Sequence, residues 1–297
     1  MLDPFAARPG ASLLTGLIGR GIQGSLTPAM HEREAAAHGL ALSYRRIDLD
    51  TMALGAEALP ALLDRAEAAG FSGLNITFPC KQAVIPLLHE MSEEAEALGA
   101  VNTVVLKGGR RIGHNTDCSG FAEGFSRGLP GAPLGEVVQI GAGGAGAAVA
   151  EALLRQGVGR LTIHDVDAAR AEAIAASLRT RFGAARARAG IALEDALDSA
   201  DGVVNCTPVG MAKLPGMPMP VGLLRPELWV AEIIYFPLET ALLHAARALG
   251  CRTLDGGGMA VFQAVGAFRL FTAREPDPSR MLAHFAELVR HIDAWPN

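Results

Sequence analysis

The sequence of 297 residues is poor in aromatic side chains and has no long apolar run. Aromatic residues make up 5% of the chain, with 2 Trp and 2 Tyr, so Ala, Val, Leu and Ile have to build most of the core. No stretch of about 18 apolar residues occurs that could cross a bilayer. The opening MLDPFAARPG lacks the charged and apolar regions of a secretory signal. These absences predict a soluble cytoplasmic protein.

Clustered cysteines are also absent. The chain has no CxxC pair and no Cys/His group with the spacing of metal ligands. We therefore expect no metal site and no redox motif, and reduced thiols at all four positions. The cysteines are Cys80, Cys118, Cys206 and Cys251.

Basic residues are not in excess, because 26 Lys and Arg stand against 31 Asp and Glu, for a net charge of −5. Such a balance gives no general attraction to nucleic acid or to an anionic membrane. Half of the residues are hydrophobic and 19% are charged, which excludes a disordered or low-complexity chain. The expected partner is a small molecule, bound by a monomer or a homodimer.

The chain length predicts two domains, since one domain usually takes about 100–200 residues. Strand-like and helix-like segments alternate, which is typical of an α/β fold with a mostly parallel sheet. A Gly-Gly-Arg-Arg turn at 108–111 and a shift in composition near Asp117 mark the start of a second unit. In the first third we expect strands at 14–18, 44–49, 73–77 and 101–106, and helices at 28–38, 59–69, 84–89 and 93–98.

A glycine-rich turn at 141–146 follows a short apolar strand and opens an Ala-rich helix. Gly141 permits a tight turn, Gly143 lets the backbone approach a pyrophosphate, and Gly146 permits close packing of the helix on the strand. The N–H groups at the start of the helix then face the phosphates. The pattern predicts a Rossmann-type, doubly wound domain whose dinucleotide contacts include Gly141, Gly143, Gly144, Ala145 and Gly146.

Asp165 ends the next strand, 24 positions after Gly141. A carboxylate there accepts hydrogen bonds from the adenosine ribose and would repel the 2′-phosphate of NADP. The following residue is Val166, and the first arginine after Asp165 is Arg170. The alternative role of Asp165 as a helix N-cap falls more naturally to Asp167. NAD is therefore the expected cofactor, with NADP as the alternative.

Lys81 and Asp117 each follow a predicted strand, where open α/β sheets place their ligand crevices. A lysine amine can take the proton of an alcohol as it is oxidised, and its ammonium form can return the proton to a ketone. The spacing alone leaves an alternative for each residue. Lys81 could be an ordinary surface residue, and Asp117 could cap the following helix.

The chain resembles the shikimate/quinate dehydrogenase family in seven ordered motifs. They are Ser25-Leu26-Thr27-Pro28-Ala29-Met30-His31, Gly73-Leu74-Asn75-Ile76-Thr77-Phe78-Pro79-Cys80-Lys81, Gly99-Ala100-Val101-Asn102-Thr103, Gly113-His114-Asn115-Thr116-Asp117, Asn205-Cys206-Thr207-Pro208-Val209-Gly210-Met211, Asp255-Gly256-Gly257-Gly258-Met259 and Gln263-Ala264.

The resemblance implies a two-domain α/β enzyme that oxidises quinate or shikimate reversibly at the C3 hydroxyl. It implies a substrate domain of residues 1–117 completed by 255–297, around an NAD-binding Rossmann domain of residues 118–254. Lys81 and Asp117 would be the catalytic pair.

The resemblance also assigns binding residues. Ser25 and Thr27 would bind the substrate carboxylate, although both precede Pro28 and can equally be read as N-caps. Thr77, Asn102 and Gln263 would bind ring hydroxyls. The nicotinamide side would be lined by Asn205, Thr207, Gly210, Met211, Ile233, Tyr235, Gly257 and Met259, with Tyr235 also near the substrate.

Three features depart from the biosynthetic shikimate enzymes. Gly24 stands where a His is more frequent, and Thr27 replaces a second Ser, as in the quinate-accepting branch. Cys80 stands where a His or an aromatic residue is more usual, and a buried structural thiol is favoured over a nucleophile because no base is recognisable nearby. The alternatives are an NADP-dependent biosynthetic enzyme, an aminoshikimate-type relative and a non-catalytic ligand sensor.

Overall fold

The computed structural model describes residues 3–190 and 192–293. The chain divides into two compact units. The first contains the residues up to 116 and those from 263 onward, and the second contains residues 117–262. The later division falls inside helix α10 (Gly257–Thr272), whereas the sequence placed a domain limit at 255.

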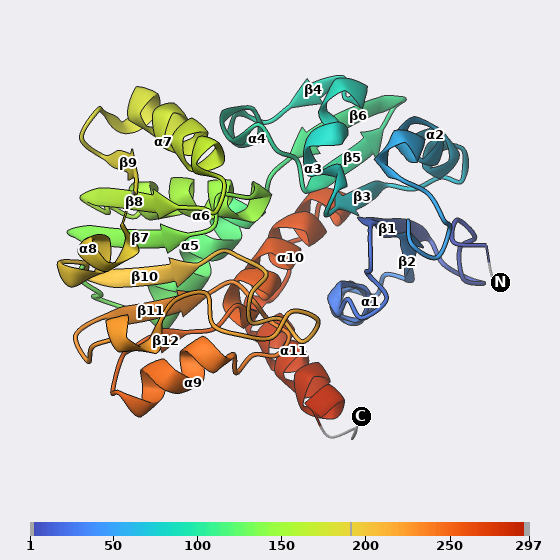
Figure 1. The fold of residues 1–297 in the computed structure, drawn as a ribbon. Helices are drawn as coiled ribbons and strands as arrows, with labels where there is room; N and C mark the ends of the chain where they lie inside the picture. The colour runs from blue at the N-terminus through green and yellow to red at the C-terminus, as the bar shows by residue number, and fades with distance from the viewer. Residues whose placement is uncertain (1–2, 191, 294–297) are drawn as a thin grey trace. The chain divides into compact units, whose positions relative to one another are not determined.

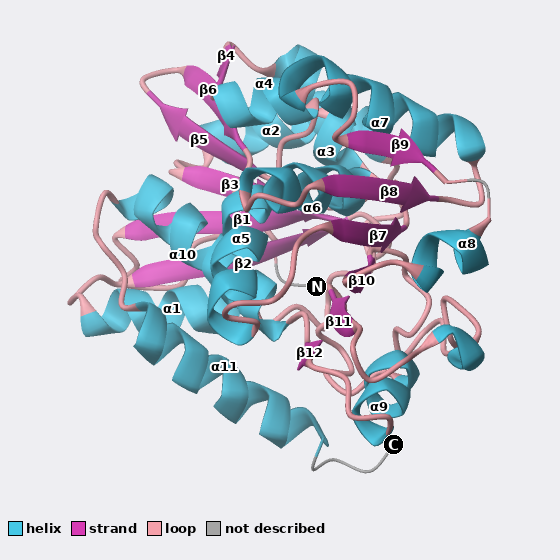
Figure 2. Cartoon of the chain, turned by 90° about the vertical axis from the view of Figure 1, so that its left-hand side faces the viewer, coloured by secondary structure: helices cyan, strands magenta, loops and turns pink. Residues whose placement is uncertain are grey.

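The first unit is built on a six-stranded sheet in the order β2-β1-β3-β5-β6-β4 (Figure 2). The strands β1, β2 and β3 are parallel, but β5 runs antiparallel to both β3 and β6. The expectation of a mostly parallel sheet is confirmed, because among the described strands of this unit β5 alone runs opposite to the others, which makes the sheet mixed. The strands are β1 (Leu13–Gly19), β2 (Leu42–Asp48), β3 (Gly73–Ile76), β4 (Glu90–Met91), β5 (Thr103–Lys107) and β6 (Arg110–His114).

A tight hairpin explains the change of direction. Gly108 and Gly109 both have positive φ, 59° and 73°, and they join Lys107 to its partner Arg110. Two positive-φ residues make the turn that matches the twist of paired strands. The two arginines expected in the turn belong to β6, where Arg111 donates to Glu67 at 2.8 and 3.0 Å.

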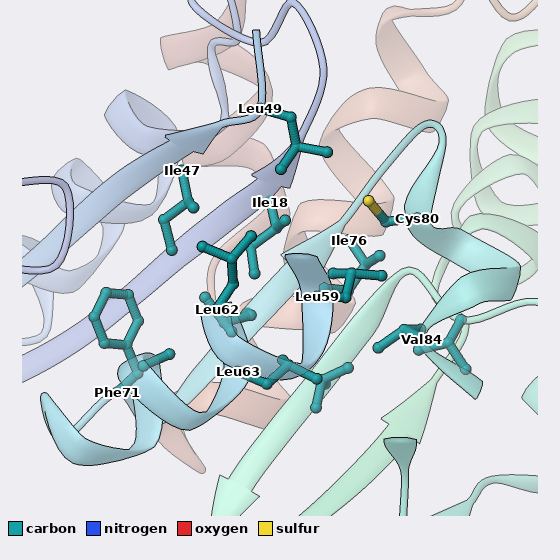
Figure 3. Close-up of a cluster of buried hydrophobic side chains, with 14 of the residues drawn as sticks. Ile18, Ile47, Leu49, Leu59, Leu62, Leu63, Phe71, Ile76, Cys80 and Val84 are labelled. Carbon is teal, nitrogen blue, oxygen red and sulfur yellow. The ribbon is translucent and has the colours of Figure 1, made fainter. Parts of the chain in front are cut away.

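Helices cover both faces of this sheet. On one face, α2, α3 and α4 bury an aliphatic cluster that includes Ile18, Ile47, Leu63 and Ile76 (Figure 3). The helix expected at 84–89 is only the 3₁₀ turn η2, because Pro86 has no N–H to continue a helical ladder. The helical segments here are α2 (Leu59–Ala68), α3 (Cys80–Ala83), α4 (Glu93–Leu98), η1 (Ala56–Ala58) and η2 (Ile85–Leu87).

The other face carries α1 (Thr27–Ala37) and the second half of α10, with α11 (Pro278–Asp293) packed on α1. His31 is fully buried among the rings of Tyr44, Phe268 and Phe271, and this burial lowers its pKa to about 3. It is therefore a neutral core residue at physiological pH. Arg280 of α11 donates to the buried Glu34 of α1 and joins the two helices.

The second unit is a parallel six-stranded sheet in the order β12-β11-β10-β7-β8-β9, as Figure 1 shows. Counted along the chain this is the order 6-5-4-1-2-3, that of a doubly wound dinucleotide fold. The Rossmann-type architecture expected from the sequence is confirmed. The strands are β7 (Glu136–Ile140), β8 (Arg160–His164), β9 (Ala187–Ala189), β10 (Gly202–Asn205), β11 (Trp229–Glu232) and β12 (Thr253–Leu254).

Alternate residues of these strands pack on opposite faces. Val138, Val203 and Val230 meet the apolar sides of α8 and α9. Trp229, on the opposite face, packs edge-on against Phe125 of α5. No helix among the described residues is long and apolar enough to span a membrane. The helical segments are α5 (Asp117–Gly128), α6 (Gly144–Arg155), α7 (Ala168–Phe182), α8 (Leu193–Asp198), α9 (Ala241–Ala248) and η3 (Val221–Leu223).

Candidate functional site

The glycine loop, residues 141–146, lies between β7 and α6 at the carboxyl edge of the second sheet. Gly141 has φ +106°, and a Cβ there would lie 2.7 Å from the carbonyl carbon of Cys206. A Cβ on Gly146 would lie 2.4 Å from the Gly141 oxygen. A Cβ on Gly143 would meet no atom within 4 Å. Two glycines are thus required by packing, whereas Gly143 leaves space open above the loop. That open cradle fits the pyrophosphate of a dinucleotide.

Gln139 braces the glycine loop from below, and sequence reasoning missed it. Its buried Nε2 donates to the carbonyl oxygens of Gly141 at 2.8 Å and Gly146 at 2.9 Å. A lone Gln in the otherwise apolar end of β7 is the only sequence signal for this role.

Asp165 fastens the same loop from the neighbouring strand. Its two carboxylate oxygens accept from the main-chain N–H of Ala142 at 2.6 Å and of Asp167 at 2.8 Å. As expected, Asp167 is the N-cap of α7, and its carboxylate also pairs with Arg170, the nitrogen and oxygen being 3.1 Å apart. Asp165 is thus held at the tip of β8 without capping a helix, and Val166 beside it is fully exposed.

A second loop, residues 206–210, follows β10 and meets the glycine loop at Gly141. Asn205 is fully buried and holds this loop. Its Oδ1 accepts from the N–H and the hydroxyl of Thr207 at 3.0 and 2.7 Å, and its Nδ2 donates to the oxygen of Val209 at 3.0 Å. The Asn205 side chain therefore supports the loop from inside, rather than lining a ligand surface as the resemblance implied.

Glu232, at the end of β11, was also missed by sequence reasoning. It is 1% exposed and accepts from Asn205 Nδ2 at 2.9 and 3.2 Å. Burial raises its pKa to about 7. An acidic residue that ends a strand gives no sign in the sequence that it faces the interior.

The remaining residues expected on the nicotinamide side lie along the same edge or at the start of α10. Gly210 has φ +113°, and Met211 and Tyr235 are partly exposed. The N–H of Ile233 donates to Asn205, and that of Gly257 donates to Asp255. Met259 follows in the first turn of α10.

In the first unit, the residues expected to bind the substrate carboxylate lie on a fastened loop. The buried carboxylate of Asp48 accepts from the N–H groups of Gly21 and Ile22, at 3.1 and 3.2 Å. Arg46 donates to the carbonyl oxygen of Ser25 at 2.8 Å. These contacts fix the segment that presents Ser25 and Thr27.

The structure gives the capping role of these hydroxyls little support. The N-cap of α1 is Leu26, without a side-chain capping bond, and Thr27 is already the first helical residue. Among the described residues, the one donor to Ser25 Oγ is the Thr27 N–H at 3.4 Å, near the limit of a hydrogen bond.

A buried polar network joins the strands β2, β3 and β5 to the segment before Asp117. Tyr44 donates to Asn75, which in turn donates to Thr103 at 3.0 Å. Asn102 exchanges hydrogen bonds with Thr116, accepting from its N–H at 2.8 Å and donating to its hydroxyl at 2.9 Å. Both Asn102 and Thr116 are almost fully buried.

Lys81 and Asp117 occupy element starts in different units. Lys81 lies in the short helix α3 and is half-buried, and its carbonyl accepts from the N–H of Val101 at 2.9 Å. Asp117 is buried and begins α5, directly after Thr116. Thr77 lies just before α3, with its methyl group against Gly19, and Gln263 lies within α10.

Cys80 is fully buried in the core of the first unit (Figure 3). Burial raises the pKa of its thiol to about 11, so the thiolate is not formed near neutral pH. The prediction of a structural thiol is confirmed.

Comparisons with known proteins agree with this geometry. Residues 17–104 match the family model of the shikimate dehydrogenase substrate binding domain, and residues 137–211 match that of the saccharopine dehydrogenase NADP binding domain. The chain is 59% identical over 287 residues to shikimate dehydrogenase (NADP(+)) of Streptomyces avermitilis, covering 94% of this chain and 99% of that protein. It is 54% identical over 281 residues to quinate/shikimate dehydrogenase (NAD(+)) of Corynebacterium efficiens, covering 93% and 99%.

Among solved structures, quinate dehydrogenase from Corynebacterium glutamicum in complex with NAD aligns with a TM-score of 0.86 and 52% identity, covering 93% of this chain and 99% of that one. The fold, the glycine loop and these relatives together define the class, an oxidoreductase with an NAD(P)-binding domain. Within that class, the chain belongs to the shikimate/quinate dehydrogenase family.

The glycine loop gives a prediction that separates folding from binding. Gly143→Ala should leave the melting temperature unchanged, because its Cβ meets nothing, but weaken dinucleotide binding at least tenfold by filling the cradle. Gly146→Ala is the matched variant, and it should lower the melting temperature because its Cβ strikes the Gly141 carbonyl. Calorimetric titration and thermal unfolding measure both effects. Unchanged affinity in Gly143→Ala would contradict a phosphate cradle at this loop.

Proposed function

We propose that the protein oxidises quinate or shikimate reversibly at the C3 hydroxyl, with NAD as hydride acceptor. The observation that carries the proposal is the shared anchorage of the two catalytic candidates. Lys81 accepts from Val101 through its carbonyl, and Thr116, which precedes Asp117, is bound to the adjacent Asn102. The dipeptide Val101-Asn102 thus fixes the main chain both at Lys81 and at Thr116, the residue before Asp117.

In this mechanism, Lys81 Nζ accepts the proton of the C3 hydroxyl during oxidation and returns it during reduction. Asp117 holds the same hydroxyl and the lysine in position, and its negative charge favours the protonated lysine once the proton has moved. NAD, when bound, supplies the acceptor for the hydride that leaves C3.

Substrate recognition is assigned to short polar side chains on fastened segments. Ser25 and Thr27 bind the carboxylate, while Thr77, Asn102 and Gln263 bind ring hydroxyls, with Tyr235 also near the substrate. Support comes from the anchors of the Ser25 segment at Asp48 and Arg46. We further propose residues 1–117 with 255–297 as the substrate domain and residues 118–254 as the nucleotide domain.

The glycine loop, Asp165, Thr207, Gly210, Met211, Ile233, Gly257 and Met259 are proposed to bind NAD. Asp165 supports NAD over NADP because its carboxylate is held where the adenosine ribose binds in this fold. The likeness to the NADP(+)-dependent enzyme of Streptomyces avermitilis favours NADP as the second candidate.

Lys81→Ala tests the proton transfer. We expect kcat to fall by roughly 10²–10⁴-fold, because positioned acid–base catalysis is worth that much. NAD affinity should stay within about twofold, since Lys81 is assigned to the substrate. Asp117→Asn keeps the size of the side chain and should lower turnover more than stability. Wild-type kcat in Lys81→Ala would remove the lysine from the mechanism.

Ser25→Ala tests the carboxylate site. It should raise KM for quinate and shikimate by about tenfold, the effect of losing one charge-assisted hydrogen bond. The affinity for NAD and the melting temperature should change little, because the one contact of the Ser25 hydroxyl within residues 3–190 and 192–293 is the weak bond at 3.4 Å. A lower melting temperature with unchanged KM would support the capping role instead.

The cofactor preference tests Asp165. NAD should be used better than NADP by at least tenfold in kcat/KM, or about 1.4 kcal/mol. Asp165→Ser combined with Val166→Arg should narrow or invert this ratio, because the change removes the repelling charge and adds a partner for the 2′-phosphate. Steady-state rates at 340 nm with each nucleotide and each substrate measure it. Equal or better use of NADP by the unmodified protein would favour the biosynthetic alternative.

A further inference from the structure

Glu232 is an unusual residue for the interior of the second unit. It is 1% exposed, and within the described part of the chain it forms no ion pair with Arg or Lys. A buried carboxylate without a counter-ion is costly, since its charge loses hydration without an opposite charge nearby. Burial accordingly raises the pKa of Glu232 to about 7. A residue with this cost requires a compensating role.

The groups around Glu232 are hydrogen-bond donors. Asn205 Nδ2 reaches both carboxylate oxygens, and the Thr240 hydroxyl donates to Oε2 at 3.2 Å. The main-chain N–H groups of Ile233 and Ile234 also favour the charged form, the latter at 3.5 Å from Oε1. The thiol of Cys206 is the nearby titratable group, and its raised pKa keeps it neutral. This environment suits the ionised carboxylate, which only accepts hydrogen bonds.

Glu232 acts on the β10 loop, residues 206–210, through one intermediate. It holds the amide nitrogen of Asn205, whose oxygen binds both the N–H and the hydroxyl of Thr207. The main chain at Thr207 is packed against Gly141 so closely that a Cβ on Gly141 would lie 2.8 Å from its nitrogen. The carboxyl ends of β7 and β10 flank the point where the strand order reverses, which is the ligand crevice of such sheets.

We propose that Glu232 is a positioning residue for the dinucleotide: through Asn205 its ionised carboxylate holds the β10 loop against the glycine loop. The proposal rests on the assignment of the dinucleotide to this crevice. Protonation of the Glu232 carboxylate adds an O–H among hydrogen-bond donors, so the hydrogen bond from Asn205 to this carboxyl group weakens. Dinucleotide affinity should therefore fall as the pH drops through 7, while the catalytic residues Lys81 and Asp117 take no part.

Stability and binding should respond to Glu232 in opposite directions. A carboxyl group whose pKa is raised in the folded state contributes stability that is present below its unfolded pKa and lost as the pH rises through about 7. Glu232→Gln removes the buried charge at nearly constant shape. At pH 8 the variant should therefore melt at the same or a higher temperature, yet bind NAD about three- to tenfold more weakly, as loss of a hydrogen-bonded acceptor predicts.

The experiment is a calorimetric titration of the whole protein with NAD between pH 6 and 8.5, together with thermal unfolding. Glu227→Gln is the control, because it removes the same charge from an exposed site at the opposite end of β11. Wild type and control should lose affinity several-fold towards pH 6, and Glu232→Gln should be weaker at pH 8 and nearly independent of pH.

Three results would overturn the proposal: wild-type affinity in Glu232→Gln, an unaltered pH dependence in that variant, or parallel loss of affinity and stability at pH 8, which marks a merely structural role. A wild-type protein that binds neither NAD nor NADP at any pH would instead overturn the proposed function.

Discussion

The contact between the glycine loop and the β10 loop is the constraint on which the nucleotide-binding unit depends. The main chains at Gly141 and at Cys206–Thr207 are so close that no side chain fits between them. Neither loop can therefore shift without the other. Polar side chains at this edge hold the two loops that make that contact. Gln139 and Asp165 hold the glycine loop, and Asn205 holds its neighbour.

The first unit uses a similar device at the edge that carries the residues proposed to bind the substrate. Asn75 near the end of β3 and Asn102 before β5 are buried, and their amides bind neighbouring strands and the Thr116 segment. In each unit an asparagine therefore fixes the main chain beside a loop that is assigned to a ligand. Amide groups suit this position because they donate and accept at once without the cost of a buried charge.

The sequence predicts the regular parts of this structure well and the supporting polar groups poorly. Strands such as 73–77 and the glycine loop were recognisable because apolar runs and glycine spacing reflect local geometry. The strands β4 and β12 have two residues each, too few for any periodicity, and β6 begins with two arginines that look like a turn. The reversal at β5 depends on strand pairing that no local pattern encodes.

The candidate site shows the same limit at the level of single residues. The glycines of the loop are recognisable in the sequence, because few structures other than a nucleotide-binding turn explain their spacing before a helix. Asp48, Gln139 and Glu232 are not recognisable in this way, because the sequence around a polar residue in a strand does not show whether its side chain faces water or the interior. Only the folded chain shows that Asp48 accepts from main-chain N–H groups, that Gln139 donates to main-chain carbonyls and that Glu232 accepts from the amide of Asn205. Burial thus makes these ordinary polar residues supports for the site. It also raises the pKa of Glu232 to about 7, so that this carboxyl group titrates in a range where exposed carboxylates do not.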